Sequence, residues 1–89
     1  MRKNILITGA STGLGEGMAR EWAAKGCNLA LCARRADKLE ALQRELQQAH
    51  PDIRVLVRGL DVCDYDQVFE VFRGFRDYLG SLDRVVVNA

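Results

Sequence analysis

Thr8-Gly9-Ala10-Ser11-Thr12-Gly13-Leu14-Gly15 is the stretch that decides the fold, and it directly follows the short apolar run Ile5-Leu6-Ile7. A stretch with helical character, Leu14 to Lys25, comes next. Glycines let a backbone turn sharply and approach a ligand closely, because they carry no Cβ. A helix that starts inside such a turn directs unpaired N–H groups and the positive end of its dipole at whatever lies there. This order of strand, turn and helix therefore predicts a phosphate-binding site.

The composition of the chain is that of one ordinary globular domain. Of its 89 residues, 48% are apolar and 28% are charged, and the net charge is +1. A charge this small gives no electrostatic footprint for nucleic acid or for an anionic membrane. The apolar run after Met1-Arg2-Lys3 is too short for a signal peptide, and no stretch approaches the roughly 20 apolar residues of a membrane span. We expect a cytoplasmic protein without a membrane span that binds no nucleic acid.

The three cysteines, Cys27, Cys32 and Cys63, indicate neither disulfides nor a metal site. Their number is odd, and no two of them have the spacing of metal ligands. Both features are typical of reduced thiols in a cytosolic protein. We expect no bound metal, and we expect all three cysteines to be small buried residues.

Strands and helices are predicted to alternate along the whole chain. Apolar, partly β-branched runs predict strands at 3–8, 27–33, 53–58 and 84–87, and helical spacing of apolar residues predicts helices at 14–25, 36–49 and about 64–79. Such alternation implies an α/β fold, a doubly wound Rossmann-type parallel sheet with helices on both faces and strand order 3-2-1-4. Ligands bind such sheets at the carboxyl ends of the strands, where the strand order reverses. The glycine turn and Asn88 would flank that crevice together.

The third predicted helix carries several aromatic residues. Asp64 is a good N-cap, and Gln67 three residues later comes close to a capping box. An apolar stripe is expected to pack on the sheet, and both tyrosines are expected to pack in or beside this helix. The stripe consists of Val68, Phe72, Phe75 and Leu79, widened by Phe69 and Val71.

The glycine turn reads T-G-x-x-x-G-x-G, not the general dinucleotide fingerprint G-x-G-x-x-G. With this turn the chain resembles the N-terminal part of the short-chain dehydrogenase/reductase family. Three further features match at the family's spacing: Ala33-Arg34-Arg35, Leu60-Asp61-Val62 and Asn88-Ala89, each at a predicted strand end. The last pair begins the family's N-A-G motif, although Val87 precedes it where many members carry another Asn. The resemblance covers essentially the whole chain and implies an oxidoreductase that interconverts a carbonyl and an alcohol by hydride transfer.

The resemblance assigns the residues of the glycine turn to the cofactor. Gly9, Gly13 and Gly15 would allow the turn, the close approach to the pyrophosphate and helix–strand packing. The hydroxyls of Ser11 and Thr12 and the backbone N–H of Leu14 would donate to cofactor phosphates or ribose. Helix capping is the other use of those hydroxyls, and both uses can hold at once.

Arg34 carries the prediction of cofactor type. Enzymes that prefer NAD place an acidic residue about 20 residues past the glycines, where it binds the adenosine ribose 2′-OH. Here that place holds Arg34, followed by Arg35. A carboxylate would repel the 2′-phosphate of NADP, whereas a guanidinium binds it with paired, charge-assisted hydrogen bonds. The alternative is two solvated arginines, but the start of a helix disfavours cations. We therefore expect NADP(H), with NAD(H) as the less favoured cofactor.

The other two motifs are assigned to the adenine and ribose side of the site. By resemblance, Asp61 accepts from the adenine amino group and Val62 gives an apolar wall and a backbone N–H. The alternative is that Asp61 only caps the next helix. Asn88, followed by Ala89, would help hold the sheet and lie beside the cofactor ribose, although it could also be a strand-end turn residue.

The family's chemistry also needs a Ser, and a Tyr with a Lys four residues later. The residue four after Tyr65 is Phe69, and the residue four after Tyr78 is Leu82. We therefore expect residues 1–89 to be the N-terminal part of a single dinucleotide-binding domain, inactive alone. The parent protein would be a homo-oligomer acting on a small carbonyl or alcohol. Two alternatives stay open: a non-catalytic NADP-binding sensor or scaffold of the same fold, and a helical interaction module without nucleotide.

The fourth predicted strand would leave an open, valine-rich sheet edge. We expect a longer parent chain, a partner or a swapped copy to cover it.

Overall fold

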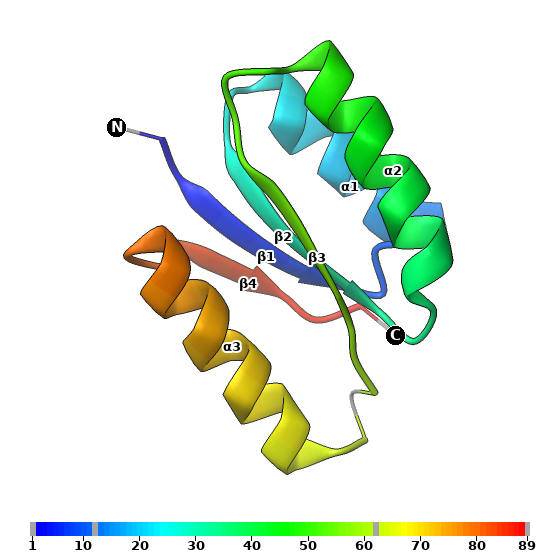
Figure 1. Ribbon diagram of the computed structural model, residues 1–89, viewed down its shortest axis with the longest axis vertical. Coiled ribbons are helices and arrows are strands. Elements are labelled where there is room, and N and C mark those ends of the chain that lie inside the picture. Colours follow the sequence, from blue (N-terminus) through cyan, green and yellow to red (C-terminus); the bar gives the residue numbers. More distant parts are fainter. Residues whose placement is uncertain (1, 12, 62, 89) are drawn as a thin grey trace.

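The computed structural model describes residues 2–11, 13–61 and 63–88 and shows a parallel four-stranded sheet between two layers of helices (Figure 1). The strands are β1 (Asn4–Thr8), β2 (Asn28–Ala33), β3 (Val55–Gly59) and β4 (Arg84–Val86), and the helices are α1 (Gly13–Ala24), α2 (Ala36–Ala49) and α3 (Tyr65–Leu79). The strand order is β3-β2-β1-β4. The predicted fold class and strand order are therefore confirmed, and element bounds differ from the prediction by one or two residues.

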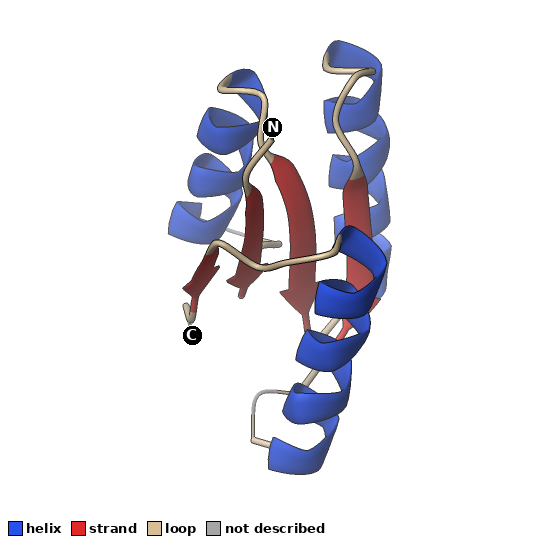
Figure 2. Ribbon diagram, turned by 90° about the vertical axis from the view of Figure 1, so that its left-hand side faces the viewer, coloured by secondary structure: helices blue, strands red, loops and turns tan. Residues whose placement is uncertain are grey.

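The two faces of the sheet are covered unequally. Helices α1 and α2 lie on one face and α3 lies on the other (Figures 1 and 2). Because successive side chains of a strand point to opposite faces, Ile5 and Ile7 of β1 pack with α1 and α2 while Leu6 packs toward α3. Leu39, Leu42 and Leu46 form the buried stripe of α2. The two central strands, β1 and β2, are thus covered on both faces. Because these strands are packed in the core, the residues that directly follow them start from defined positions.

Helix α3 buries a narrower face than the sequence predicts. Val71 and Phe75 are buried, but Phe69 is 65% exposed, and Tyr65 and Tyr78 are exposed as well. The expectation that Phe69 widens the packed face is wrong, whereas Tyr65 and Tyr78 belong to α3, as predicted, with side chains that are exposed. A helix that lies on one sheet buries one stripe of its surface, and these residues lie outside that stripe.

The start of α3 is capped by Asp64, as predicted. Its carboxylate accepts a hydrogen bond from the backbone N–H of Gln67 at 3.2 Å. The reciprocal half of a capping box is absent from this turn, because the Gln67 side chain instead accepts from the backbone N–H of Asp61 at 3.1 Å. Gln67 therefore ties the helix to the loop that follows β3.

The cysteine prediction holds in part. Cys27 and Cys32 are buried free thiols, whereas Cys63 is exposed, so the expectation that all three are buried is wrong. Cys63 lies in the short loop before α3, where no second layer covers it. Within the part of the chain that the structure describes, no helix is long and apolar enough to cross a membrane.

A polar network fastens the amino ends of the strands. The backbone N–H of Asn4 donates to the Asp83 carboxylate at 2.7 Å, and the Asn28 side-chain amide donates to Asn4 Oδ1 at 2.9 Å. The backbone N–H of Arg54 donates to Asn28 Oδ1 at 2.8 Å. Asn4 is buried, so these bonds satisfy polar groups that would otherwise destabilise the fold.

Candidate functional site

The glycine turn is fastened to the carboxyl end of β2, and the carboxyl end of β3 is fastened to β2 as well. The backbone N–H of Ala10 donates to the Cys32 carbonyl at 3.1 Å, and the backbone N–H of Leu60 donates to the Ala33 carbonyl at 2.8 Å. Thr8 lies opposite Cys32 in the parallel register of β1 and β2. Because these strand ends are tied to one another, the residues that follow each of them converge on one edge of the sheet.

Asn88 joins this edge from the other side of β1. Its backbone N–H donates to Thr8 Oγ1 at 2.9 Å, and its side-chain amide donates to the Gly9 carbonyl at 3.3 Å. The Thr8 hydroxyl lies 3.4 Å from the Val86 carbonyl, to which it can donate. Asn88 and the glycine turn therefore line one cavity, as predicted, and the place of Asn88 beside the cofactor ribose stays a prediction.

Thr8 belongs to the framework of this site, although sequence reasoning did not select it. It is 1% exposed, and its hydroxyl contacts residues about 80 positions away in the chain. The available signal was a hydroxyl residue at the end of a fully buried strand, where a polar side chain needs a partner.

Two glycines of the turn are required by close packing. Gly9 has φ +63°, and a Cβ there would press into the backbone carbonyl of Asn88. A Cβ on Gly15 would press into the Gly9 carbonyl and lie 3.0 Å from both the Ala10 Cα and the Asn88 amide nitrogen. The absence of both Cβ atoms lets α1 start directly against the end of β1. This geometry matches the helix–strand packing role that the sequence assigned to Gly15.

The opposite side of the turn is open. Gly13 has φ +56°, and nothing lies within 4 Å of the position that its Cβ would take. Ser11 is half-buried, and Leu14 is 72% exposed. Thr12, which was predicted as a further donor, lies outside the described residues. The described turn thus offers open space, a hydroxyl and backbone N–H groups on the side that faces away from the core.

A small cavity lies beside the turn at the ends of β1, β2 and β3. Its volume is about 100 Å³, and its lining, which is chiefly apolar, comes from Thr8, Gly9, Cys32, Ala33, Arg34, Leu60 and Asn88. Burial raises the pKa of the Cys32 thiol to about 12, so this thiol stays protonated and unreactive at neutral pH. The cavity suits a flat apolar group.

Positive charge lies at the mouth of this cavity. Arg34 lines the cavity and is exposed, and no described carboxylate forms an ion pair with it. Arg35 is the N-cap of α2, makes no side-chain cap hydrogen bond, and lies 3.9 Å from Asp37. With Ser11 and the N–H groups of the turn, these residues form a set of donors suited to an anion. The described residues hold no cluster of three metal-ligating side chains.

Asp61 sits at the end of β3 with part of its carboxylate already used. Its Oδ1 accepts from the backbone N–H of Cys63 at 2.9 Å. Asp61 therefore holds the loop after β3, whereas the cap of α3 is Asp64, and the predicted adenine contact stays a prediction. Val62 and Ala89 were predicted beside the cofactor and lie outside the described residues. Gln67 was expected near the cap of α3, but the contact of its side chain with Asp61 was missed, since nothing in its spacing shows that the side chain turns back to this loop.

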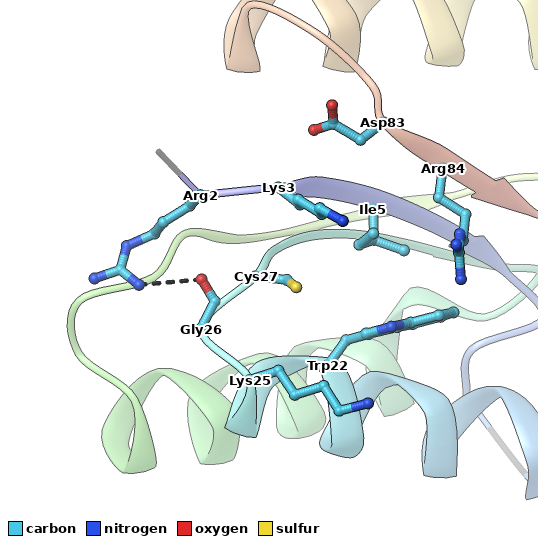
Figure 3. A pocket seen from close by; sticks show the side chains of 9 residues that line it. All are labelled: Arg2, Lys3, Ile5, Trp22, Lys25, Gly26, Cys27, Asp83 and Arg84. Atoms are coloured by element: carbon cyan, nitrogen blue, oxygen red, sulfur yellow. Dashed lines mark hydrogen bonds between the residues drawn. The ribbon is translucent and has the colours of Figure 1, made fainter.

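A larger hollow, of about 1030 Å³, lies at the opposite end of the sheet (Figure 3). Its lining includes Arg2, Lys25, Trp22 and Arg84. The Arg84 guanidinium lies over the Trp22 ring at 5.8 Å, and Arg2 donates to the Gly26 carbonyl at 3.0 Å. No residue of the sequence motifs lines this hollow. The candidate site is therefore the smaller cavity at the carboxyl ends of the strands.

Comparison with known proteins shows the family of this chain. Residues 3–89 match the family described as short chain dehydrogenase, and the chain belongs to that family. An uncharacterized oxidoreductase of Mycobacterium tuberculosis is 57% identical over 88 residues, which are 99% of this chain and 35% of that protein. The chain thus spans about a third of the length of this curated relative.

Two solved structures share the fold closely. An alcohol dehydrogenase from the archaeon Thermococcus sibiricus, complexed with 5-hydroxy-NADP, has a TM-score of 0.90 and 39% identity, covering 96% of this chain and 36% of that one. L-Sorbose reductase from Gluconobacter frateurii, complexed with NADPH and L-sorbose, has a TM-score of 0.91 and 34% identity, covering 99% and 33%.

Proposed function

We propose that these residues form the NADP(H)-binding portion of an oxidoreductase that interconverts a carbonyl and an alcohol. The observation that carries the proposal is the convergence of three features at one sheet edge: Arg34, with which no described carboxylate forms an ion pair, the open side of the glycine turn, and Asn88. In this assignment the pyrophosphate lies against the turn at Gly13, and the adenosine half lies toward Arg34 and Asp61.

The choice of NADP over NAD rests on charge at the end of β2. A guanidinium without an acidic partner can form paired hydrogen bonds with a 2′-phosphate, which a carboxylate would repel. Both solved structures described above were determined with an NADP-type cofactor. Their identities of 39% and 34% support carrying that preference to this chain as a proposal.

The chemistry supplied by the bound nicotinamide is hydride transfer to or from a carbonyl carbon. The residues of this chain would bind and orient the cofactor. Backbone N–H groups of the turn and the Ser11 hydroxyl hold phosphate oxygens, and Arg34 holds the 2′-phosphate. Asn88 keeps the Gly9 carbonyl fixed, so that the turn holds one shape when the cofactor binds. Because such a turn is already ordered, it loses less conformational entropy than a flexible turn when the cofactor binds.

Residues outside this chain would perform the proton transfer. The 89 residues contain no Tyr followed four residues later by Lys. We expect the coding sequence after Ala89 to continue with a Gly, then a Ser, then Tyr-x-x-x-Lys, and the full protein to be a homo-oligomer that acts on small carbonyls or alcohols. The substrate pocket would lie in that continuation.

A turnover assay tests whether the full-length protein catalyses the proposed reaction. The full-length protein is mixed with NADPH and a panel of aldehydes and ketones, and NADPH absorbance is followed. Oxidation that depends on the carbonyl compound is the expected result. Tight NADPH binding without turnover, together with a continuation that lacks Tyr-x-x-x-Lys, would instead favour the non-catalytic sensor or scaffold. Failure to bind either NADPH or NADH would refute both.

A further inference from the structure

The loop that follows β3 is joined to the start of α3 by a closed ring of three hydrogen bonds. The backbone N–H of Asp61 donates to Gln67 Oε1 at 3.1 Å, and the backbone N–H of Gln67 donates to Asp64 Oδ1 at 3.2 Å. The backbone N–H of Asp64 donates to the Asp61 carbonyl at 3.0 Å, which closes the ring. The main chain of Asp61 is therefore held on both sides, through its N–H and through its carbonyl.

The Gln67 side chain connects this ring to the packed side of the helix. Gln67 is half-buried, and it precedes the buried residues Val71 and Phe75 by about one and two helical turns, so the three residues lie along one face. That face packs on the sheet, whose opposite side is covered by α1 and α2 (Figures 1 and 2). The position of Asp61 thus depends on how α3 packs on the sheet.

The same arrangement fixes one oxygen of the Asp61 carboxylate and leaves the other available. Oδ1 accepts from the backbone N–H of Cys63 at 2.9 Å, and no hydrogen bond joins Oδ2 to any residue that the structure describes. Leu60, one residue earlier, lines the small cavity at the carboxyl ends, and its N–H donates to the Ala33 carbonyl at 2.8 Å. Asp61 therefore follows directly on the cavity lining, with a backbone that is fastened to β2 on one side and to α3 on the other.

We propose that Gln67 is a positioning residue for the adenosine half of the cofactor, and that it acts through Asp61. The inference rests on the proposed function, because it needs the adenosine half to lie toward Asp61. Without the Gln67 acceptor, the Asp61 N–H has lost its partner and the Asp61 backbone is held on one side only. Its carboxylate must then be ordered when adenosine binds, which costs conformational entropy. Gln67 thus raises the affinity for adenosine without touching the cofactor.

The test compares Gln67→Leu with a matched control on α2. Gln67→Leu removes the acceptor and keeps a side chain of similar size. Gln43→Leu removes a comparable bond between a helix and β3, because Gln43 Nε2 donates to the carbonyl of Val55, at the opposite end of that strand. Binding of NADPH, NADH and adenosine 2′,5′-bisphosphate to the full-length variants is measured by calorimetry, and their stability is measured by urea denaturation.

We expect both variants to unfold at lower urea concentrations, but only Gln67→Leu to bind more weakly. Its affinity should fall about fivefold to tenfold for all three ligands, because each of them contains adenosine. Gln67→Glu keeps an acceptor oxygen at the same reach, so its affinities should stay within about twofold of the wild-type values. Should Gln67→Leu fail to fold, Gln67→Asn, whose amide is one methylene too short, takes its place with the same expected loss.

Other results would overturn the inference in distinguishable ways. If Gln67→Leu is destabilised but binds all three ligands like the wild-type protein, Gln67 has only a structural role and the proposed function stands. An equal loss in Gln67→Glu or in Gln43→Leu would show that the Gln67 acceptor is not responsible. A loss for NADPH without a loss for the bisphosphate would place the effect away from adenosine. If the wild-type protein binds none of the three ligands, the proposed function fails and this inference fails with it.

Discussion

The two ends of the sheet differ in size and in how much of their polar chemistry is already satisfied. The hollow at the amino ends measures about 1030 Å³, against about 100 Å³ for the cavity at the carboxyl ends. At the amino ends, Asn4, Asn28 and Asp83 bond to one another or to backbone, and Arg84 lies over Trp22. At the carboxyl ends, Arg34 is unpaired among the described residues, and the turn at Gly13 faces open space. The open turn and the sequence motifs that meet at the carboxyl ends, more than volume, indicate where a ligand binds.

The largest effect is expected at the glycine turn. Gly15→Ala places a Cβ against the Gly9 carbonyl and the Ala10 Cα, which are both backbone and cannot rotate away. We expect the free energy of unfolding to fall by about 3 kcal/mol and NADPH binding to be lost. Urea denaturation and calorimetry measure the two effects.

Gly17→Ala is the matched control, two residues along the same helix. Nothing lies within 4 Å of the Cβ position of Gly17. Alanine is the better helix former, so this variant should gain up to about 1 kcal/mol of stability. It should also keep NADPH binding. Equal behaviour of the two variants would show that α1 does not start against the turn in the way described.

A smaller effect, confined to one cofactor, is expected at the end of β2. Arg34→Gln removes a charged fork but keeps a polar side chain of similar shape. We expect NADPH affinity to fall about 30-fold, which corresponds to roughly 2 kcal/mol. NADH affinity should change by less than about twofold, because NADH has no 2′-phosphate. A parallel loss for both nucleotides would contradict the placement of the 2′-phosphate at Arg34.

The smallest effect is expected at the amino ends of the strands. Asp83→Ala removes the acceptor for the backbone N–H of Asn4 and changes the lining of the larger hollow. We expect the free energy of unfolding to fall by about 1 to 2 kcal/mol, and NADPH affinity measured well below the unfolding transition to stay unchanged. A selective loss of NADPH binding in this folded variant would indicate that the cofactor binds at the amino ends of the strands. That result would contradict the assignment of the site to the carboxyl ends.

The sequence predicts the parts of this molecule that local patterns determine. The glycine turn and the Asp64 cap follow from spacing and turn chemistry within a few residues, and the strand order follows from the alternation of strands and helices along the chain. Phe69 was misplaced because α3 carries apolar residues on more than one side, and only the packed structure shows which side meets the sheet. The contact of the Gln67 side chain with Asp61 was missed because a side chain that turns back to a loop leaves no periodic signal.

The contacts that complete the site could not be read from the chain. Thr8 bonds with Asn88 across 80 positions, and Asn4 bonds with Asp83 across 79. Such pairs depend on β1 lying beside β4, which follows from the topology and not from either residue alone. For the same reason the ion pair between Arg20 and Glu45 has no signal in the sequence.

Titration of the full-length wild-type protein with NADPH and, separately, with NADH tests the central claim most directly. If the carboxyl-end cavity and Arg34 form an NADP(H) site, NADPH should bind at least about tenfold more tightly, a difference of about 1.4 kcal/mol. The NADPH preference should weaken as salt is added, because exposed charges are screened. Tighter binding of NADH, or no binding of either nucleotide, would contradict the account.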